Sequence, residues 1–275
     1  MIELYIGAGV LGLLVLLFVA YLICAAPVKN DKIKEYKGKY FAHRGLHGDG
    51  RAENSMSAFK AAIEGGYGIE LDIRLSSDGK LVVFHDDTLD RVCAREGRVI
   101  DFTAEELSAF SLSGTEDGVP LFSDVLKLVD GRVPILVEIK ENQGDLSVSD
   151  AAAEMLKDYR GEYLLQSFNP ISVGNFAKKI SDVPRGILSQ DYLKEKQYRR
   201  LTYFLLGILA LNRVCKPCFV AFNRRDGKFI PLRLIRRLFG VVTFAWTVRS
   251  PEEEAEAKKN GFDVIIFEKY IPENK

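Results

Sequence analysis

The chain is poor in cysteine and histidine and has no excess of charge of either sign. Its 275 residues include four cysteines and three histidines, and 38 basic residues balance 38 acidic ones. A net charge of zero gives no overall attraction to nucleic acid, so we predict no nucleic-acid partner. Cys24 lies in an apolar run, and the other three cysteines are an odd number for a disulfide framework. Cys215 and Cys218 have CxxC spacing, but no second Cys or His pair lies nearby to complete a zinc site.

One long apolar run is present, at the start of the sequence. Residues 4–26 contain no charged residue, and a helix needs roughly 20 apolar residues to cross about 30 Å of hydrocarbon. Signal peptides open with positive residues and have an apolar core of about 7–15 residues, whereas this segment opens Met-Ile-Glu and is longer. We therefore predict a transmembrane anchor over residues 1–27, with a cleaved signal peptide as the alternative.

Basic residues flank only one end of this run. No Lys or Arg precedes it, and five lysines come after it: Lys29, Lys32, Lys34, Lys37 and Lys39. By the positive-inside rule, the chain on the C-terminal side of the span is cytoplasmic. The sequence thus predicts a single-pass protein of the cell membrane, with a polar linker at residues 28–38 and a cytoplasmic catalytic domain at residues 39–275.

After the linker, short β-branched or aromatic runs alternate with helical patterns, as in parallel α/β folds. Nine runs qualify as strands: Tyr40–Arg44, Ile69–Leu75, Leu81–His85, Ile135–Lys140, Tyr163–Ser167, Arg185–Leu188, Phe219–Asn223, Val242–Val248 and Val264–Phe267. The second and third are joined by Ser-Ser-Asp-Gly, a turn that makes a hairpin and not a parallel crossover. Eight strands remain, the number in a (β/α)8 TIM barrel of about 250 residues. We predict that barrel, with a β-hairpin extension after its second strand.

Two helical segments are distinctive. In the first, Asn54 or Ser55 is a candidate N-cap, Met56, Phe59 and Ile63 recur at helical spacing, and two glycines end the pattern at residues 65–66. The second, Leu201–Leu211, is apolar, too short to span a bilayer, and flanked by basic residues that include Arg199 and Arg213. It is either a helix packed on the barrel or one lying on a membrane surface.

Acidic residues occur inside otherwise apolar strands. Glu70 and Asp72 are two residues apart, so both point to one face of their strand and repel each other unless a cation lies between them. Glu138 and Lys140 likewise share a face of another strand. Taken singly, the first pair could be an exposed strand edge and the second an ion pair across the core. Together, these costly buried charges favour a cation site.

Histidines stand where two of these strands end. His43 closes the first strand, and the hairpin returns His85 towards the second. Imidazole titrates near neutral pH, so a pair of histidines beside a cation can supply the proton transfers of a hydrolysis. His85 alone could be an interior histidine. The third, His47, lies in a loop and is expected to line the entrance or face solvent.

The motifs that contain these residues resemble the signature of the glycerophosphodiester phosphodiesterase family. Over about residues 38–270 they occur in this order: His43-Arg44-Gly45, Glu53-Asn54-Ser55 with Ala58-Phe59, Glu70-Leu71-Asp72, Ser77-Asp78-Gly79, His85-Asp86, Glu138-Ile139-Lys140, Gln166-Ser167-Phe168 and Trp246-Thr247-Val248. Departures are Ala52 for a common proline, Glu268 within Phe267-Glu268-Lys269 for the usual Thr-Asp, and Arg249 for a frequent Asn. They put in doubt the polar contacts of the last strand and the rim of the pocket.

The resemblance implies a division of roles. One divalent cation, Mg or Ca, would be held by Glu70, Asp72 and Glu138. His43 and His85 would be the acid and base, and Arg44 and Lys140 would bind the phosphate. Residues expected to support or line the pocket are Glu53, Asn54, Phe168 and Trp246.

The implied reaction is hydrolysis of a glycerophosphodiester to glycerol 3-phosphate and an alcohol. Two alternatives remain open. The anchor and Leu201–Leu211 make a lysophospholipase D-like activity on membrane lysolipids plausible with the same site. An inactive lipid-binding or scaffolding protein is the other, although such a protein has no chemical reason to keep all five metal and histidine positions filled.

Overall fold

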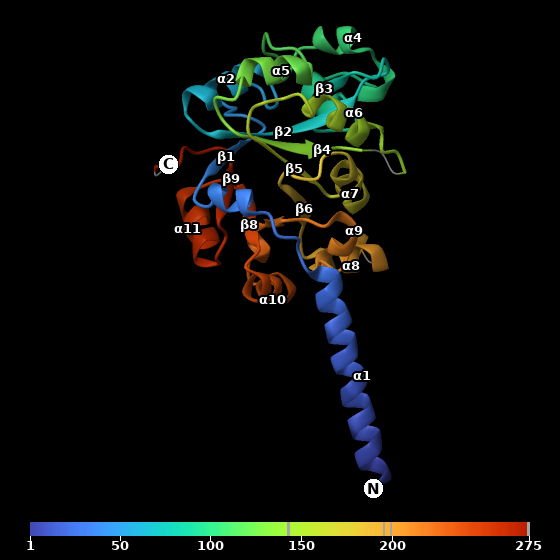
Figure 1. The fold of residues 1–275 in the computed structure, drawn as a ribbon. Coiled ribbons are helices and arrows are strands. Elements are labelled where there is room, and N and C mark those ends of the chain that lie inside the picture. The colour runs from blue at the N-terminus through green and yellow to red at the C-terminus, as the bar shows by residue number, and fades with distance from the viewer. Residues whose placement is uncertain (142–143, 195, 199, 274–275) are drawn as a thin grey trace.

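The computed structural model describes residues 1–141, 144–194, 196–198 and 200–273, and within them eight parallel strands close into a barrel (Figure 1). The strands neighbour one another in chain order, and the first closes the ring by pairing with both the second and the last. They are β1 (Tyr40–His43), β2 (Gly68–Leu75), β4 (Ile135–Ile139), β5 (Tyr163–Ser167), β6 (Arg185–Ser189), β7 (Phe219–Asn223), β8 (Val242–Val248) and β9 (Val264–Phe267). The predicted (β/α)8 fold is confirmed.

The predicted hairpin extension is also present. β3 (Leu81–Val83) pairs antiparallel with β2, and Gly79 in the turn has φ +74°, a conformation that suits glycine. β3 ends at Val83 and not at His85. β1 ends at His43 because Arg44 has φ 57°, outside the extended region.

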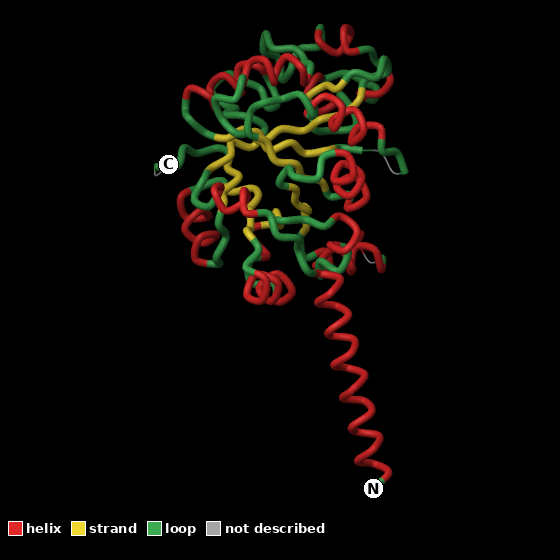
Figure 2. Tube along the Cα trace, in the orientation of Figure 1, coloured by secondary structure: helices red, strands yellow, loops and turns green. Residues whose placement is uncertain are grey.

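Helices cover the outside of the barrel (Figure 2). The longer ones are α2 (Met56–Glu64), α5 (Phe122–Val129), α6 (Ser147–Leu156), α7 (Pro170–Lys179), α10 (Ile230–Phe239) and α11 (Pro251–Lys259). Short helical turns are α3 (Asp90–Cys93), η2 (Val99–Asp101), α4 (Ala104–Ser108), η3 (Tyr192–Lys194), η4 (Lys196–Tyr198) and η5 (Arg224–Asp226). Of the two candidate caps of α2, Ser55 fills the role, and its Oγ accepts from the Ala58 amide at 3.2 Å.

Leu201–Leu211 is not one helix. It contains α8 (Leu201–Gly207), and α9 (Asn212–Cys215) comes after a break at Leu209, which has φ 64°. Leu206 and Leu209 are buried, whereas Leu201 and Phe204 are exposed. The flanking Arg199 lies outside the described residues.

The barrel interior is apolar towards the amino-terminal ends of the strands and polar towards their carboxyl ends. The apolar layer includes Phe41, Leu136, Leu164, Leu188, Phe219 and Phe244. It also takes in η1 (Asp31–Tyr36), within the expected linker, because Ile33 and Tyr36 are buried in the same cluster. Residues 31–36 therefore close one end of the barrel, and the polar residues face the other.

The apolar N-terminal run forms α1 (Ile2–Ala25), which extends away from the barrel (Figure 1). Within it, Leu4–Ala25 is long and apolar enough to cross a membrane. Only its last turns contact the barrel. The Asn212 side chain donates to the Ala25 carbonyl at 2.8 Å, and the Tyr21 hydroxyl donates to the Ile208 carbonyl at 3.0 Å.

Candidate active site

Three carboxylates from two neighbouring strands converge inside the barrel. Asp72 of β2 lies opposite Glu138 of β4, and Glu70 is two residues before Asp72 on the same face. All three are buried, and one oxygen of each lies within 4.8 Å of those of the other two. Alternation along both strands places these acids inside and their apolar neighbours against the helices.

This convergence shifts the pKa values of the three carboxylates. Burial raises the pKa of Glu70 well above its usual value, and the charges of Asp72 and Glu138 raise it further. Burial likewise raises the pKa of Glu138. Asp72 is the exception: burial would raise its pKa, but the charges of Lys140, His85 and Arg44 hold it below the usual value. The Lys140 ammonium lies 3.2 Å from Asp72 Oδ1 and contacts Glu138.

The donor set fits a hard divalent cation. Carboxylate and amide oxygens are the ligands that Mg²⁺ and Ca²⁺ prefer. Gln166 of β5 adds an amide beside the acids: its Nε2 donates to Glu70 Oε1 at 3.4 Å. Its buried Oε1 has no hydrogen-bond partner within the described part of the chain.

His43, at the end of β1, is held by a carboxylate from the far end of the chain. Its Nδ1 lies 2.6 Å from Glu268 Oε2, just after β9. Burial lowers the pKa of His43, and the hydrogen bond to Glu268 opposes that shift. Glu268 Oε1 accepts from Arg249 Nε at 2.6 Å, and His47 Nε2 is 3.6 Å from Glu268 Oε2. Two residues that depart from the family pattern, Arg249 and Glu268, are thus in direct contact.

His85 is held by the next residue in the chain. Its Nδ1 lies 2.6 Å from Asp86 Oδ1, and Asp86 Oδ2 accepts from Arg91 Nε at 2.6 Å. Burial lowers the pKa of His85 to about 4. Burial alone would raise the pKa of Asp86, but the hydrogen bonds from Arg91 and His85 lower it to about 2.

Arg44 and Asn54 brace the acidic cluster through their backbone conformations. Both have positive φ, 57° and 54°, and the Asn54 amide donates to the Arg44 carbonyl at 2.9 Å. The Arg44 amide donates to Glu70 Oε2 at 3.1 Å, and Asn54 Nδ2 donates to Asp72 Oδ2 at 2.9 Å. The Arg44 guanidinium pairs with Glu53 at 2.6 Å. Glu53 also accepts two hydrogen bonds from Arg91, at 2.7 and 2.8 Å.

These residues meet at one pocket of about 200 Å³. Its lining includes most of the residues predicted from the sequence, namely His43, Arg44, Glu70, His85, Glu138, Lys140, Phe168 and Trp246. Phe168 and Trp246 form its aromatic wall, with ring centroids 5.4 Å apart in an edge-to-face arrangement. Asp72, Glu53 and Asn54 do not line it, but each contacts Arg44, which does.

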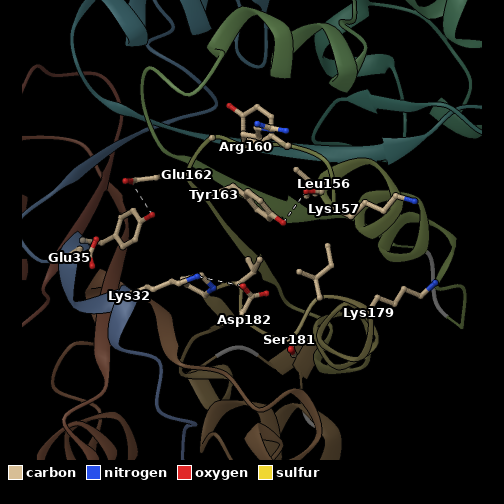
Figure 3. A pocket seen from close by; sticks show the side chains of 16 residues that line it. Lys32, Glu35, Leu156, Lys157, Arg160, Glu162, Tyr163, Lys179, Ser181 and Asp182 are labelled. Carbon is tan, nitrogen blue, oxygen red and sulfur yellow. Dashed lines mark hydrogen bonds and ion pairs between the residues drawn. The ribbon is translucent and has the colours of Figure 1, made fainter.

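A larger cleft of about 690 Å³ lies at the opposite end of the barrel, between η1 and the starts of β5 and β6 (Figure 3). Its walls carry scattered charges, such as Lys32 and Asp182, 3.6 Å apart. Among the described residues that line it there is no histidine and no cluster of three metal-ligating side chains. The smaller pocket is therefore the candidate site.

Several residues of the site were not identified from the sequence. Gln166 and Asp86 belong to the family motifs, but the sequence alone indicates no role for them, and Glu268 stands out there only as a departure from the family pattern. Glu268 did have a signal, since it comes directly after a buried strand. Arg91, which links Glu53 to Asp86, had none.

Comparison with known proteins agrees with this geometry. The sequence model described as "Glycerophosphoryl diester phosphodiesterase family" matches residues 43–270. A glycerophosphodiester phosphodiesterase of Caldanaerobacter subterraneus subsp. tengcongensis is 31% identical over 239 residues, which cover 82% of this chain and 91% of that protein. A human lysophospholipase D is more distant, at 27% identity over 61% of this chain and 58% of its own length.

Solved structures show the same fold. A phosphodiesterase of Oleispira antarctica, determined in complex with the product sn-glycerol-3-phosphate, superposes with a TM-score of 0.71 at 20% identity, covering 85% of this chain and 94% of that one. A glycerophosphodiester phosphodiesterase of Thermotoga maritima gives 0.63 at 27% identity, covering 83% and 93%.

Proposed function

The chain belongs to the glycerophosphoryl diester phosphodiesterase family and is a phosphoric diester hydrolase, and we propose that it cleaves glycerophosphodiesters to glycerol 3-phosphate and an alcohol with one cation and two histidines. One observation carries the proposal. A single small pocket brings together buried carboxylates, two cationic side chains and two histidines that each have a carboxylate partner.

Glu70, Asp72 and Glu138 are the proposed ligands of one Mg²⁺ or Ca²⁺. A bound divalent cation would stabilise the negative charge that develops on the phosphate oxygens. Arg44 and Lys140 are proposed to bind the remaining phosphate charge, since both line the pocket and keep their positive charge there. Glu53 and Asn54 hold Arg44 and Asp72 in place.

The two histidines are proposed to carry the protons. Because a carboxylate occupies Nδ1 of each ring, Nε2 is left for the substrate. One Nε2 accepts the proton of the attacking hydroxyl as its oxygen bonds to phosphorus. The other donates a proton to the alkoxide as the old phosphorus–oxygen bond breaks. The attacking oxygen belongs either to a glycerol hydroxyl of the substrate, giving a cyclic phosphate that water then opens, or to water itself.

The size of the pocket favours a small substrate. A volume of about 200 Å³ is below the roughly 300–1,000 Å³ typical of sites that enclose drug-sized ligands. It suits a glycerophosphate group better than a group with an acyl chain. The lysolipid alternative retains support from the apolar α1 and from relatives named lysophospholipase D.

We also propose that α1 is a retained membrane anchor with the barrel in the cytoplasm. Ala25 is fully buried and Asn212 binds its carbonyl, so the end of α1 is packed as part of the domain. A leader destined for removal needs no such contacts. The cytoplasmic orientation rests on the lysines after the span.

A substrate panel tests the reaction. The full-length protein is assayed with Mg²⁺ or Ca²⁺ on glycerophosphocholine and on lysophosphatidylcholine micelles. We expect glycerol 3-phosphate from the first, with turnover lowered about 10²–10⁴-fold in His43→Ala and in His85→Ala. Asp182→Ala, in the larger cleft, is the control and should keep full turnover. Near-normal turnover in either histidine variant contradicts the scheme, and preferential release of choline from lysolipid supports the alternative.

A further inference from the structure

Charge is segregated along this chain although its total is zero. Residues 196–250 contain twelve of the 38 basic residues and only one of the 38 acidic residues, Asp226. Asp226 is buried and paired with Lys194, so it does not offset the basic side chains at the surface. Within this segment Arg224 and Arg249 are paired with Glu253 and Glu268. The basic side of the barrel is formed by α9 and α10, which carry Arg213, Arg233, Arg236 and Arg237.

Exposed apolar side chains gather in the same region. Beyond residues 1–25, seven of the eleven large apolar residues that are exposed within the described chain lie between residues 193 and 239. They are Leu193, Leu201, Phe204, Val214, Ile230, Leu238 and Phe239. Scattered apolar residues on a surface are ordinary, but a cluster of them among arginines marks an interaction surface.

α10 shows the mixture most clearly. Its inner face packs on the barrel through the buried Leu232 and Ile235. Its outer face carries Ile230, 76% exposed, and Leu238, 51% exposed, interleaved with Arg233 and Arg237. Neither arginine forms an ion pair within the described residues. A helix with apolar and cationic residues on its solvent side is suited to a membrane interface.

The position of α1 places this face at a bilayer. Residues 4–20 of α1 are exposed and only Tyr21–Ala25 meets the barrel. Residues 4–20 span about 26 Å at 1.5 Å per residue, which is most of the roughly 30 Å thickness of the hydrocarbon core. The bilayer surface would then lie near Tyr21, which is bonded to Ile208 directly after α8. In the direction in which α1 leaves the barrel, α8 and α10 reach furthest (Figure 1).

We infer that the outer faces of α8 and α10 form a second membrane contact, which docks the barrel on an anionic lipid surface beside the anchor. The arginines meet lipid phosphates and the apolar side chains enter the headgroup region. The inference rests on the proposed anchoring by α1. The exposed aliphatic residues Leu201, Ile230 and Leu238 suit contact with lipid, and the net charge of zero gives the chain no overall attraction to nucleic acid.

Tryptophan reporters in the full-length protein test this contact, because the chain has a single native tryptophan, Trp246. Leu238→Trp reports on α10, Leu13→Trp reports on α1, and Ser108→Trp on α4 is the control at the opposite edge of the barrel (Figure 1). Each variant is reconstituted in vesicles of phosphatidylcholine, with or without phosphatidylglycerol, that contain brominated lipids as quenchers.

We expect quenching at Leu238→Trp that exceeds quenching at Ser108→Trp by on the order of twofold or more, since interfacial helices enter the headgroup boundary. Quenching at Leu238→Trp should increase with the content of phosphatidylglycerol and should fall when Arg233→Glu and Arg237→Glu are introduced into the same variant. Quenching at Leu13→Trp but not at Leu238→Trp overturns the docking face and leaves the anchor intact. No quenching at Leu13→Trp overturns the anchor and the docking face together. Shielding of Leu238→Trp already in detergent, without quenching in vesicles, assigns the face to a second copy of the chain and also overturns the inference.

Discussion

At the scale of single residues, the site depends on how each histidine ring is held. The partner of His85 is the next residue, Asp86, whereas the partner of His43 is Glu268, 225 positions along the chain. A carboxylate on Nδ1 fixes the tautomer of an imidazole and would stabilise the imidazolium formed in the proposed proton transfer. Glu268 is in turn bound by Arg249, so the state of His43 is set by two residues at the rim.

The first prediction concerns Glu268→Gln. The carboxylate raises the pKa of His43 against the effect of burial, so its removal should lower that pKa. The limb of the pH profile of kcat/KM that belongs to His43 should then move to lower pH. Turnover should fall about 10²–10⁴-fold, as expected when a general acid or base is no longer held in position.

Arg249→Gln provides the matched comparison. Loss of the positive charge beside Glu268 strengthens the field of that carboxylate on His43, so the same limb should move to higher pH. If both variants leave the limb where the wild type has it, Glu268 has no influence on the titration of His43 and its contact is structural only.

The second prediction concerns Glu70→Gln. It removes one anionic ligand, so the affinity for Mg²⁺ and Ca²⁺ and the activity should both fall by at least about tenfold, roughly the loss of one charged interaction of 1.4 kcal/mol. Burial and two neighbouring acids keep the pKa of Glu70 high, so a neutral amide should preserve the melting temperature of the cation-free protein. Calorimetric titration, with Glu64→Gln on the exposed side of α2 as control, measures the affinity. Unchanged cation binding would exclude Glu70 as a ligand.

The sequence predicted the residues of the pocket better than the contacts between them. Glu70, Asp72 and Glu138 could be placed on one side because alternation along a strand is a local property. Arg91 lies five positions from Asp86 but 38 from Glu53, and Glu268 lies 225 positions from His43. Glu268 reaches His43 only because β9 pairs with β1 and closes the barrel.

At the scale of elements, η1 closes the amino-terminal end of the barrel. Ile33 is 4% exposed and packs in the same cluster as Phe41, Leu136 and Phe219. Ile33 and Tyr36, in the connection from α1 to β1, therefore belong to the barrel core, and α1 is joined to the barrel through a short ordered segment. This arrangement limits how far the barrel can rotate away from α1.

The third prediction concerns the packing of η1. Ile33→Ala should lower the free energy of unfolding by about 2–5 kcal/mol, because it leaves a cavity among large apolar residues. Ile171→Ala, at a position that is 57% exposed, should change it by less than about 0.5 kcal/mol. Denaturant unfolding in detergent, followed by circular dichroism, measures both. Equal values for the two variants would show that η1 does not stabilise the barrel.

Local patterns predicted most elements because the barrel strands are buried on both faces and read as continuous apolar runs. The hairpin was predictable from its turn, which ends in Gly79. The break between α8 and α9 was not, because Leu209, a good helix former, adopts a left-handed conformation that only its surroundings impose. η1 was not predicted for a related reason. Charged residues surround Ile33 and Tyr36 in the sequence, and only the burial of these two side chains shows that the segment is packed.

At the scale of the whole molecule, two distributions of positive charge serve different purposes. The lysines at positions 29–39 lie within 15–20 residues of the end of α1, the range that would decide the topology of the proposed anchor. The basic residues of α9 and α10 lie far beyond that range. They can act only after the barrel has folded, as a surface. The lysines proposed to set the topology are therefore separate from the arginines proposed to dock the barrel on the membrane.

The fourth prediction is that the barrel is accessible from the cytoplasmic side only. In sealed inside-out vesicles an added protease should digest the barrel, and in right-side-out vesicles the barrel should survive until detergent is added. The reason is that moving the five lysines that follow the apolar run across the membrane is opposed. Replacing those lysines by glutamine, together with Glu3→Lys before the apolar run, should weaken or reverse the bias. Digestion from the outer face of the wild-type protein would contradict the topology, yet it would leave the pocket chemistry untouched, since no residue of that site depends on which side of the bilayer it lies.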